Sequence, residues 1–372
     1  MTPASVLTLS ILTIPEREDY LRRLLQSIVA LRMNPPAHID IVYNRPLDGA
    51  LGDMVARITE FAPALHVEVY SNAGETSIVA GRNLQLSVCR TPLIAFVDDD
   101  LTLHGDVVPA LLDTLAQHPV GLVGLPSFDG DSDRIVKPRE TTPGLDLHGL
   151  KYKPVQGMLC AGYRALFADI GGFNPRRRYW GEWTELNLRM WRSGYPTAYQ
   201  MDRGFLRHWQ NAPSSPTRNM TGREQHVVWG LLCTALEYDA VDVTEATEMF
   251  WRLVEERYLA YSFGDELSPR NVLKTVLELA PQISAEWGSI QAFRQQAAAH
   301  RFQFAPFHRF SLEEVQAVEA HARTAIEPYR QRLSRDVVRA SGAHMVTSAV
   351  SPTLRGAFSR LVQSIRNVGK RM

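Results

Sequence analysis

Three consecutive aspartates, Asp98, Asp99 and Asp100, directly follow the apolar run LIAFV at residues 93–97. The run has the length and composition of a buried strand. Adjacent carboxylates repel one another, and a divalent cation would relieve that repulsion, because hard cations bind oxygen ligands and keep positions open for a substrate phosphate. Ligands of open α/β sheets bind at the carboxyl ends of strands. The aspartates therefore predict a cation and phosphate site, with a solvated acidic turn as the alternative.

Two other residues could complete such a site. Arg82 lies at the start of a predicted helix over residues 81–88, which leads into the same strand. An arginine there can bind a diphosphate through bidentate hydrogen bonds, assisted by the amides of the helix terminus. His208 follows a predicted strand over residues 195–201, where its imidazole could be a further ligand of the cation, although a lone histidine is more often structural.

A pair of glutamates offers general-base chemistry. Glu182 and Glu185 fall in the first turn of a predicted helix over residues 182–192, flanked by Trp180 and Trp183. On a helix these carboxylates lie on nearly the same face, so one could accept a proton while the other orients a hydroxyl. The alternative is helix-dipole complementarity, for which acidic residues in the first turn are common.

The elements that must position these residues alternate along the first part of the chain. Apolar strands are predicted at residues 6–14, 39–43, 66–70, 93–97, 120–125 and 195–201. Helical spacing separates most of them, which predicts βαβ units and a Rossmann-like α/β fold with a mostly parallel sheet. The polar segment 128–154 is predicted to be a long surface loop, and residues 211–223 a mobile one.

Helical signals dominate the second part of the chain. Asp242 with Glu245, and Ser311 with Glu314, match capping boxes. We predict three parts, which are an α/β domain over residues 1–224, an all-α domain over residues 225–345 and a basic amphipathic helix over residues 346–372. That last helix could dock its apolar stripe on this protein or on a second copy in a homo-oligomer, or lie on an anionic membrane surface.

The bulk composition excludes some functions. The 372 residues include 40 basic and 40 acidic side chains, so no net charge attracts the chain to nucleic acid or to a membrane. Three cysteines without CxxC spacing argue against a zinc knuckle and a disulfide framework, which fits a reducing compartment. The N-terminus is predicted to be a strand rather than a signal peptide, and no apolar run reaches the roughly 20 residues of a spanning helix. We expect a cytoplasmic protein, with a peripheral position at the inner face of the membrane as the alternative.

The order of these motifs resembles that of family 2 glycosyltransferases with the GT-A fold, over about residues 5–215. The motifs are TIPER at residues 13–17, GRN at 81–83, FVDDD at 96–100, GGF at 171–173, GEWTEL at 181–186 with Arg189, and His208. The aspartate triplet alone is weakly specific, whereas the ordered set is much more so.

The resemblance implies a nucleotide-sugar donor bound across the N-terminal half, with Mn²⁺ or Mg²⁺ bridging its diphosphate. The implied metal ligands are Asp98, Asp100 and His208. The implied donor-binding residues are Thr13, Pro15, Glu16, Asn44, Arg82, Asn83, Asp98 and Asp99. Members of the family are mostly inverting, so a carboxylate takes the proton of the acceptor hydroxyl as that hydroxyl attacks the anomeric carbon.

Two positions depart from the family's pattern. The family's helix usually carries a Glu-Asp pair whose aspartate is the base, and Trp183 stands at that aspartate. An indole cannot accept a proton, so the base is Glu182 or Glu185, and we favour Glu182. Asn44 with Arg45 replaces an aspartate that often reads the nucleotide base, which leaves UDP, GDP and dTDP donors open.

The resemblance also implies an acceptor class, namely a glycan, lipid-linked or glycoconjugate hydroxyl of a bacterial-type cell-envelope polysaccharide. Three arginines at residues 176–178 could attract an acidic acceptor, although solvated loop charges are the more ordinary explanation. Two other functions stay open. One is a sugar nucleotidyltransferase, although residues 10–17 lack a glycine-rich phosphate loop. The other is a nucleotide-sugar-binding scaffold that lost its base at Trp183.

Overall fold

The structure is a computed structural model. It describes residues 6–31, 37–47, 51–63, 65–138, 144–155, 157–209, 223–238, 242–255, 269–306 and 308–342. Residues 211–222 of the predicted mobile loop and the whole basic segment 346–372 lie outside the described residues.

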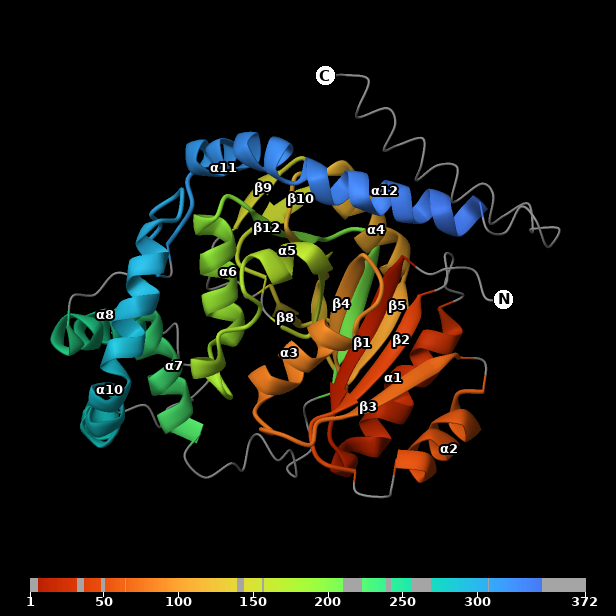
Figure 1. The fold of residues 1–372 in the computed structure, drawn as a ribbon, viewed down its shortest axis with the longest axis horizontal. Coiled ribbons are helices and arrows are strands. Elements are labelled where there is room, and N and C mark those ends of the chain that lie inside the picture. Colours follow the sequence, from red (N-terminus) through yellow and green to blue (C-terminus); the bar gives the residue numbers. More distant parts are fainter. Residues whose placement is uncertain are drawn as a thin grey trace.

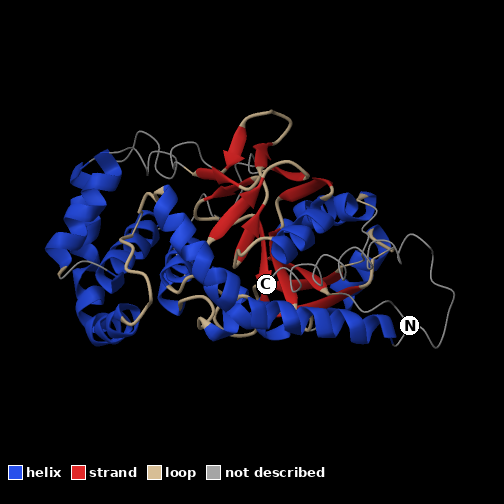
Figure 2. Ribbon diagram, turned by 90° about the horizontal axis from the view of Figure 1, so that it is seen from above, coloured by secondary structure: helices blue, strands red, loops and turns tan. Residues whose placement is uncertain are grey.

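Nine strands of the described residues form the main sheet, in the order β3-β2-β1-β4-β11-β6-β12-β10-β9. Its parallel part contains β1 (Leu7–Thr13), β2 (His38–Tyr43), β3 (Val67–Ser71) and β4 (Leu93–Asp98). Its mixed part contains β6 (Leu122–Gly124), β9 (Leu145–Leu147), β10 (Leu150–Tyr152), β11 (Leu159–Tyr163) and β12 (Thr197–Gln200). The mostly parallel α/β sheet is confirmed, and helices lie around the strands in Figure 2.

A smaller sheet brings a distant segment to the end of β4. It contains β5 (Leu101–Gly105), β7 (Ser127–Asp129), β8 (Ile135–Lys137) and β13 (Gly204–His208). Because β13 pairs antiparallel with β5, His208 lies opposite Leu101, the residue after the aspartates. The predicted loop over residues 128–154 is wrong in part, since it contains β8, β9 and β10. These strands are three residues long, too short for an alternating pattern to reveal.

Helices cover the sheet and connect its strands (Figure 1). They are the 3₁₀ turns η1 (Pro15–Arg17) and η2 (Pro175–Arg177), and the helices α1 (Glu18–Ala30), α2 (Leu51–Phe61), α3 (Ile78–Val88), α4 (Val107–Gln117), α5 (Arg164–Asp169) and α6 (Glu182–Arg192). The predicted start of α3 at Gly81 is wrong. Ser77 caps this helix by accepting a hydrogen bond from the Ala80 amide, so Arg82 lies in its second turn, away from the terminal amides.

The C-terminal region is helical, as predicted. It contains α7 (Arg223–Tyr238), α8 (Val243–Glu255), α10 (Pro269–Ala298), α11 (Leu312–Ala325) and α12 (Glu327–Gly342). Helices α7, α8 and α10 share an apolar cluster of their own, whereas α11 and α12 bury side chains in the core of the sheet domain (Figure 1). The capping box of Ser311 and Glu314 is confirmed. None of the described helices has the length and hydropathy to cross a membrane.

Candidate functional site

The three aspartates lie where β4 ends, at the carboxyl edge of the parallel strands. β1 ends beside them, and Thr13 Oγ1 donates a hydrogen bond of 2.6 Å to Asp99 Oδ2. Asp99 and Asp100 are only 2% and 6% exposed, so the fold withdraws two adjacent carboxylates from water. Such a concentration of buried negative charge requires positive partners.

Arg17 supplies one of these partners. Its Nη2 lies 2.7 Å from Asp100 Oδ2 and 3.1 Å from Asp99 Oδ1. Although burial opposes the charge of the guanidinium, the two aspartates raise the pKa of Arg17. Sequence reasoning assigned no role to Arg17. The available signal was its place in η1, four residues after β1 ends, which brings it over the same sheet edge.

Asp99 and Asp100 differ in their electrostatics. Burial raises the pKa of Asp99 to about 7. Burial acts in the same direction on Asp100, but contacts with His208 and Arg17 outweigh it and hold the pKa of Asp100 well below its usual range. His208 Nε2 lies 3.5 Å from Asp100 Oδ2, so the structure brings together two of the three residues predicted as metal ligands.

This pair suits a divalent cation. Asp100 Oδ1 is buried and has no hydrogen-bond donor among the described residues, which leaves one oxygen free beside the His208 imidazole. Mg²⁺ and similar ions commonly use one or two carboxylates and complete their shell with substrate phosphates and water. An oxygen and a nitrogen at the carboxyl edge of the sheet fit that pattern.

Asp98 has different partners. Arg82 Nη2 forms an ion pair with Asp98 Oδ1, and the Met158 amide donates a hydrogen bond of 3.0 Å to Oδ2. Arg82 is 3% exposed, and its guanidinium carbon lies 5.6 Å from the ring centroid of Trp183 and 5.9 Å from that of Phe96. Arg82 therefore orients Asp98, whose side chain is about one-third exposed, next to the two buried aspartates.

Two predicted donor-binding asparagines use their amides inside the protein. Asn44 Nδ2 donates to the carbonyls of Thr76 and Ser77, both at 2.9 Å, which holds the start of α3 against β2. Asn83 exchanges two hydrogen bonds of 2.9 Å with the backbone of Phe173. Both side chains fix the loops that surround the sheet edge.

Pro15 and Glu16 belong to η1, beside Arg17. Pro15 is the first residue of this turn, where its fixed φ suits a helical start. Glu16 is half-exposed and pairs with Arg45, which follows β2. A chain segment with one exposed ion pair thus borders the buried aspartates.

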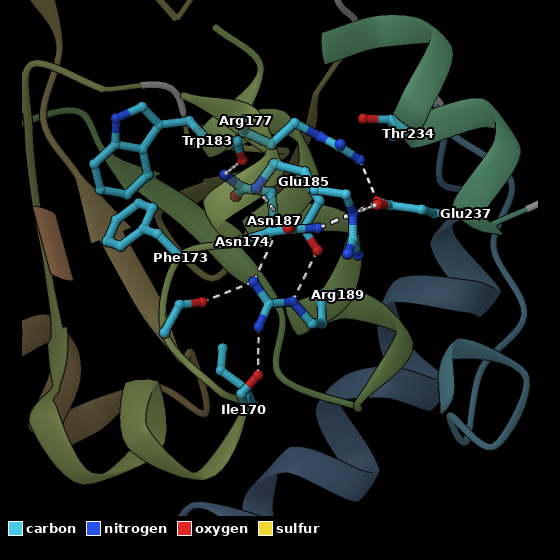
Figure 3. A network of polar contacts seen from close by, with 12 residues as sticks. Ile170, Phe173, Asn174, Arg177, Trp183, Glu185, Asn187, Arg189, Thr234 and Glu237 are labelled. Carbon is cyan, nitrogen blue, oxygen red and sulfur yellow. Dashed lines mark hydrogen bonds and ion pairs between the residues drawn. The ribbon is translucent and has the colours of Figure 1, made fainter. Parts of the chain in front are cut away.

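Helix α6 holds its two glutamates in different environments. Glu185 is fully buried and accepts hydrogen bonds from Arg189 Nε and Nη2 at 2.9 and 2.8 Å. Tyr238 Oη of α7 donates to the same carboxylate, and Arg189 continues to the carbonyls of Ile170 and Gly172 (Figure 3). Burial opposes ionisation, but Arg189 lowers the pKa of Glu185. The carboxylate of Glu185 is therefore held inside the protein by Arg189 and Tyr238.

Glu182 is the first residue of α6 and remains partly exposed. Partial burial raises its pKa above the ordinary value of 4.5, while Arg82 opposes that shift. The next residue, Trp183, packs edge-on against Phe96 and Phe173, with ring centroids 5.6 and 5.0 Å apart. The indole therefore anchors the helix start in the core and leaves Glu182 at the surface of the site.

The arginines at residues 176–178 do not form one charged loop. Arg177 is fully buried and forms an ion pair with Glu237 of α7 (Figure 3). Arg176 Nε lies 2.6 Å from the same carboxylate. The interpretation as solvated loop charges is wrong for these two residues because a buried counter-charge holds them. Arg178 is exposed, 3.5 Å from Glu75.

Residues 11–179 match the model of the family described as Glycosyl transferase family 2. Over this segment the chain is similar to family 2 glycosyltransferases. The matched segment contains Arg17 and the aspartates, and it ends before Glu182 and His208. A search of curated proteins finds no match to the chain.

Three solved structures are among those similar to the chain. The crystal structure of GalNAc-T7 with UDP, GalNAc and Mn²⁺ is 14% identical, with a TM-score of 0.45, and the alignment covers 69% of this chain and 58% of that one. TarS 1-349 from S. aureus is 11% identical, with a TM-score of 0.49 and coverages of 98% and 90%. The mannosyltransferase PcManGT from Pyrobaculum calidifontis, in complex with GDP-Man and Mn²⁺, is 17% identical, with a TM-score of 0.49 and coverages of 80% and 86%. The chain thus spans little more than half of the GalNAc-T7 structure.

Proposed function

We propose that this protein is a glycosyltransferase, which moves a sugar from a nucleotide-diphosphate donor to an acceptor hydroxyl with inversion at the anomeric carbon. The observation that carries the proposal is the convergence of Asp99, Asp100, Arg17 and His208 at the carboxyl edge of β1 and β4. These groups come from three separate segments, namely the end of β4, η1 and β13. Two buried carboxylates in contact with a guanidinium and an imidazole are suited to bind a cation and a diphosphate. A solvated acidic turn would need neither Arg17 nor His208 beside its carboxylates.

The proposed cofactor is Mn²⁺ or Mg²⁺. Asp100 and His208 would hold it, and Asp98 is the third proposed ligand. When bound, such a cation neutralises the charge that develops on a departing diphosphate. Arg17 keeps the two buried carboxylates in place through its Nη2, and Thr13 orients Asp99 through its hydroxyl.

Glu182 is the proposed base. It would accept the proton of the acceptor hydroxyl, because its raised pKa suits a proton acceptor and its side chain is partly exposed. Glu185 is a poor candidate, since its carboxylate is saturated by Arg189 and Tyr238. A glycan, lipid-linked or glycoconjugate acceptor of the cell envelope stays a proposal from the family resemblance.

A binding screen and one pair of variants test the proposal. UDP-, GDP- and dTDP-sugars are screened for Mn²⁺-dependent thermal stabilisation, because binding to the folded state raises Tm. With the donor identified, Glu182→Gln is expected to lower kcat by about 10²–10⁴-fold while the donor-induced rise in Tm persists. Asp100→Asn is expected to abolish the Mn²⁺-dependent part of that rise.

The outcomes separate the alternatives. Transfer by Glu182→Gln at the wild-type rate would refute the assignment of the base. A wild-type protein that binds the donor and neither transfers nor hydrolyses it would be a scaffold. Formation of a nucleoside triphosphate from the sugar nucleotide and pyrophosphate would identify a nucleotidyltransferase.

A further inference from the structure

A second cluster of metal-ligating side chains lies on β2 and the edge strand β3, near the end of these strands that is remote from the aspartates. His38 and Asp40 are on β2, two residues apart and therefore on one face, and Glu68 on β3 is the direct register partner of Asp40. One ligand atom from each residue lies within 4.8 Å of the others. His38 begins β2, and Tyr43 at its other end pairs with Thr13, so a rise of five residues, roughly 16 Å, separates His38 from the end of the sheet that carries the aspartates.

Asp40 is the least ordinary member of the cluster. It is 1% exposed, and neither carboxylate oxygen has a well-formed hydrogen bond among the described residues. Its close polar contact is His38 Nε2, 2.9 Å from Oδ1. A buried carboxylate beside a second carboxylate needs a cation in contact with it, and that cation is either the protonated His38 or a bound metal ion.

Glu68 is already oriented toward the same point. Tyr70 Oη donates a hydrogen bond of 2.5 Å to Glu68 Oε2, while Oε1 lies 3.8 Å from His38 Nε2. Hydrogen bonds of this kind to a ligating carboxylate fix its direction at metal sites. Arg90 also approaches Oε1, at 3.4 Å, but its side chain is 72% exposed and can turn into solvent.

The geometry points to a Zn²⁺ site formed by His38, Asp40 and Glu68, which clamps β2 to the edge strand β3. One imidazole nitrogen and two carboxylate oxygens form a three-ligand zinc set, with water in the fourth position. The imidazole favours zinc over Mg²⁺ or Ca²⁺, which prefer oxygen ligands alone. The distance from the aspartates separates this site from the transfer reaction proposed at the other end of β2.

Zinc titration of metal-stripped, full-length protein tests the site. All measurements use the Asp100→Asn background, which removes the other candidate cation site, and binding is followed by calorimetry and by the absorption spectrum of the Co²⁺ derivative. We expect one bound Zn²⁺, a rise in Tm of about 2–5 °C at a hundredfold excess over Kd, and a loss of affinity of more than about 100-fold in both His38→Ala and Glu68→Gln.

His308→Ala is the matched control. His308 Nε2 lies 2.9 Å from Glu314 Oε1, as His38 Nε2 does from Asp40 Oδ1. Among the described residues this pair belongs to no group of three metal-ligating side chains, so the variant should bind zinc like its parent. Glu68→Gln is a mild change at a partly exposed position and keeps the site testable if His38→Ala fails to fold. Equal binding by all variants, no binding by any, or loss in only one of the two ligand variants would overturn the proposal, and the imidazolium of His38 would then be the cation that balances Asp40.

Discussion

Glu237 offers the sharpest test of how the helical region supports the site. It is fully buried, pairs with the fully buried Arg177 and accepts a hydrogen bond of 2.6 Å from Arg176 Nε. Nε and Nη1 of Arg177 have no acceptor among the described residues, so Glu237 is its main counter-charge. We expect Glu237→Gln to lower the free energy of unfolding by about 3–5 kcal/mol, the cost of leaving one buried charge unpaired.

Urea unfolding followed by circular dichroism measures this loss. Asp113→Asn is the control, because the Arg203–Asp113 pair at 2.5 Å has both side chains more than a third exposed and should contribute less than about 1 kcal/mol. The double variant Arg177→Met/Glu237→Leu removes both charges and should recover much of the stability. A loss below about 1 kcal/mol in Glu237→Gln, or a double variant as unstable as the sum of the single ones, would refute the reasoning.

Three further predictions concern the site itself. Arg17→Ala removes the guanidinium that bridges Asp99 and Asp100, so the rise in Tm that Mn²⁺ induces should be larger than in the wild type; a smaller rise would contradict the role given to Arg17. Gly230→Ala should cost about 1–3 kcal/mol and lower kcat, because the added Cβ would stand 2.4 Å from the Trp180 carbonyl oxygen next to α6, whereas Gly288→Ala has open space and should be tolerated. The base must be ionised and burial raises the pKa of Glu182, so kcat/KM should fall with decreasing pH at values above 4.5, and an acid limb at or below 4.5 would count against Glu182.

The parallel strands could be predicted from the sequence because both of their faces are buried. Residues 93–97 form a continuous apolar run, and the structure shows each of them fully buried in β4. The smaller sheet could not be predicted in this way. Strands such as Ile135–Lys137 depend on pairing with segments far along the chain, and three residues carry no measurable periodicity.

The sequence indicates which residues belong to the candidate site, but it does not indicate which side chains contact one another there. The aspartates and His208 were identified from residue type and order, but only the pairing of β13 with β5 brings the imidazole to Asp100. Arg17 was missed because its distance from the end of β1 indicates the sheet edge and does not indicate which side chain of the motif turns toward the aspartates. Asn44 and Asn83 show the converse, since their amides bind backbone groups that a sequence pattern cannot locate.

The difference between Glu182 and Glu185 depends on contacts with α7 and not on the local sequence of α6. Both residues occupy the first turn of α6 and carry the same local signature. Glu185 is withdrawn by Arg189 within the helix and by Tyr238, which comes from α7, 53 residues further along the chain. The same helix places Gly230 against the turn before α6 and Glu237 on Arg177. The helical region therefore decides which carboxylate is free at the site, and a chain that ended before α7 would expose Glu185 and leave Arg177 without its counter-charge.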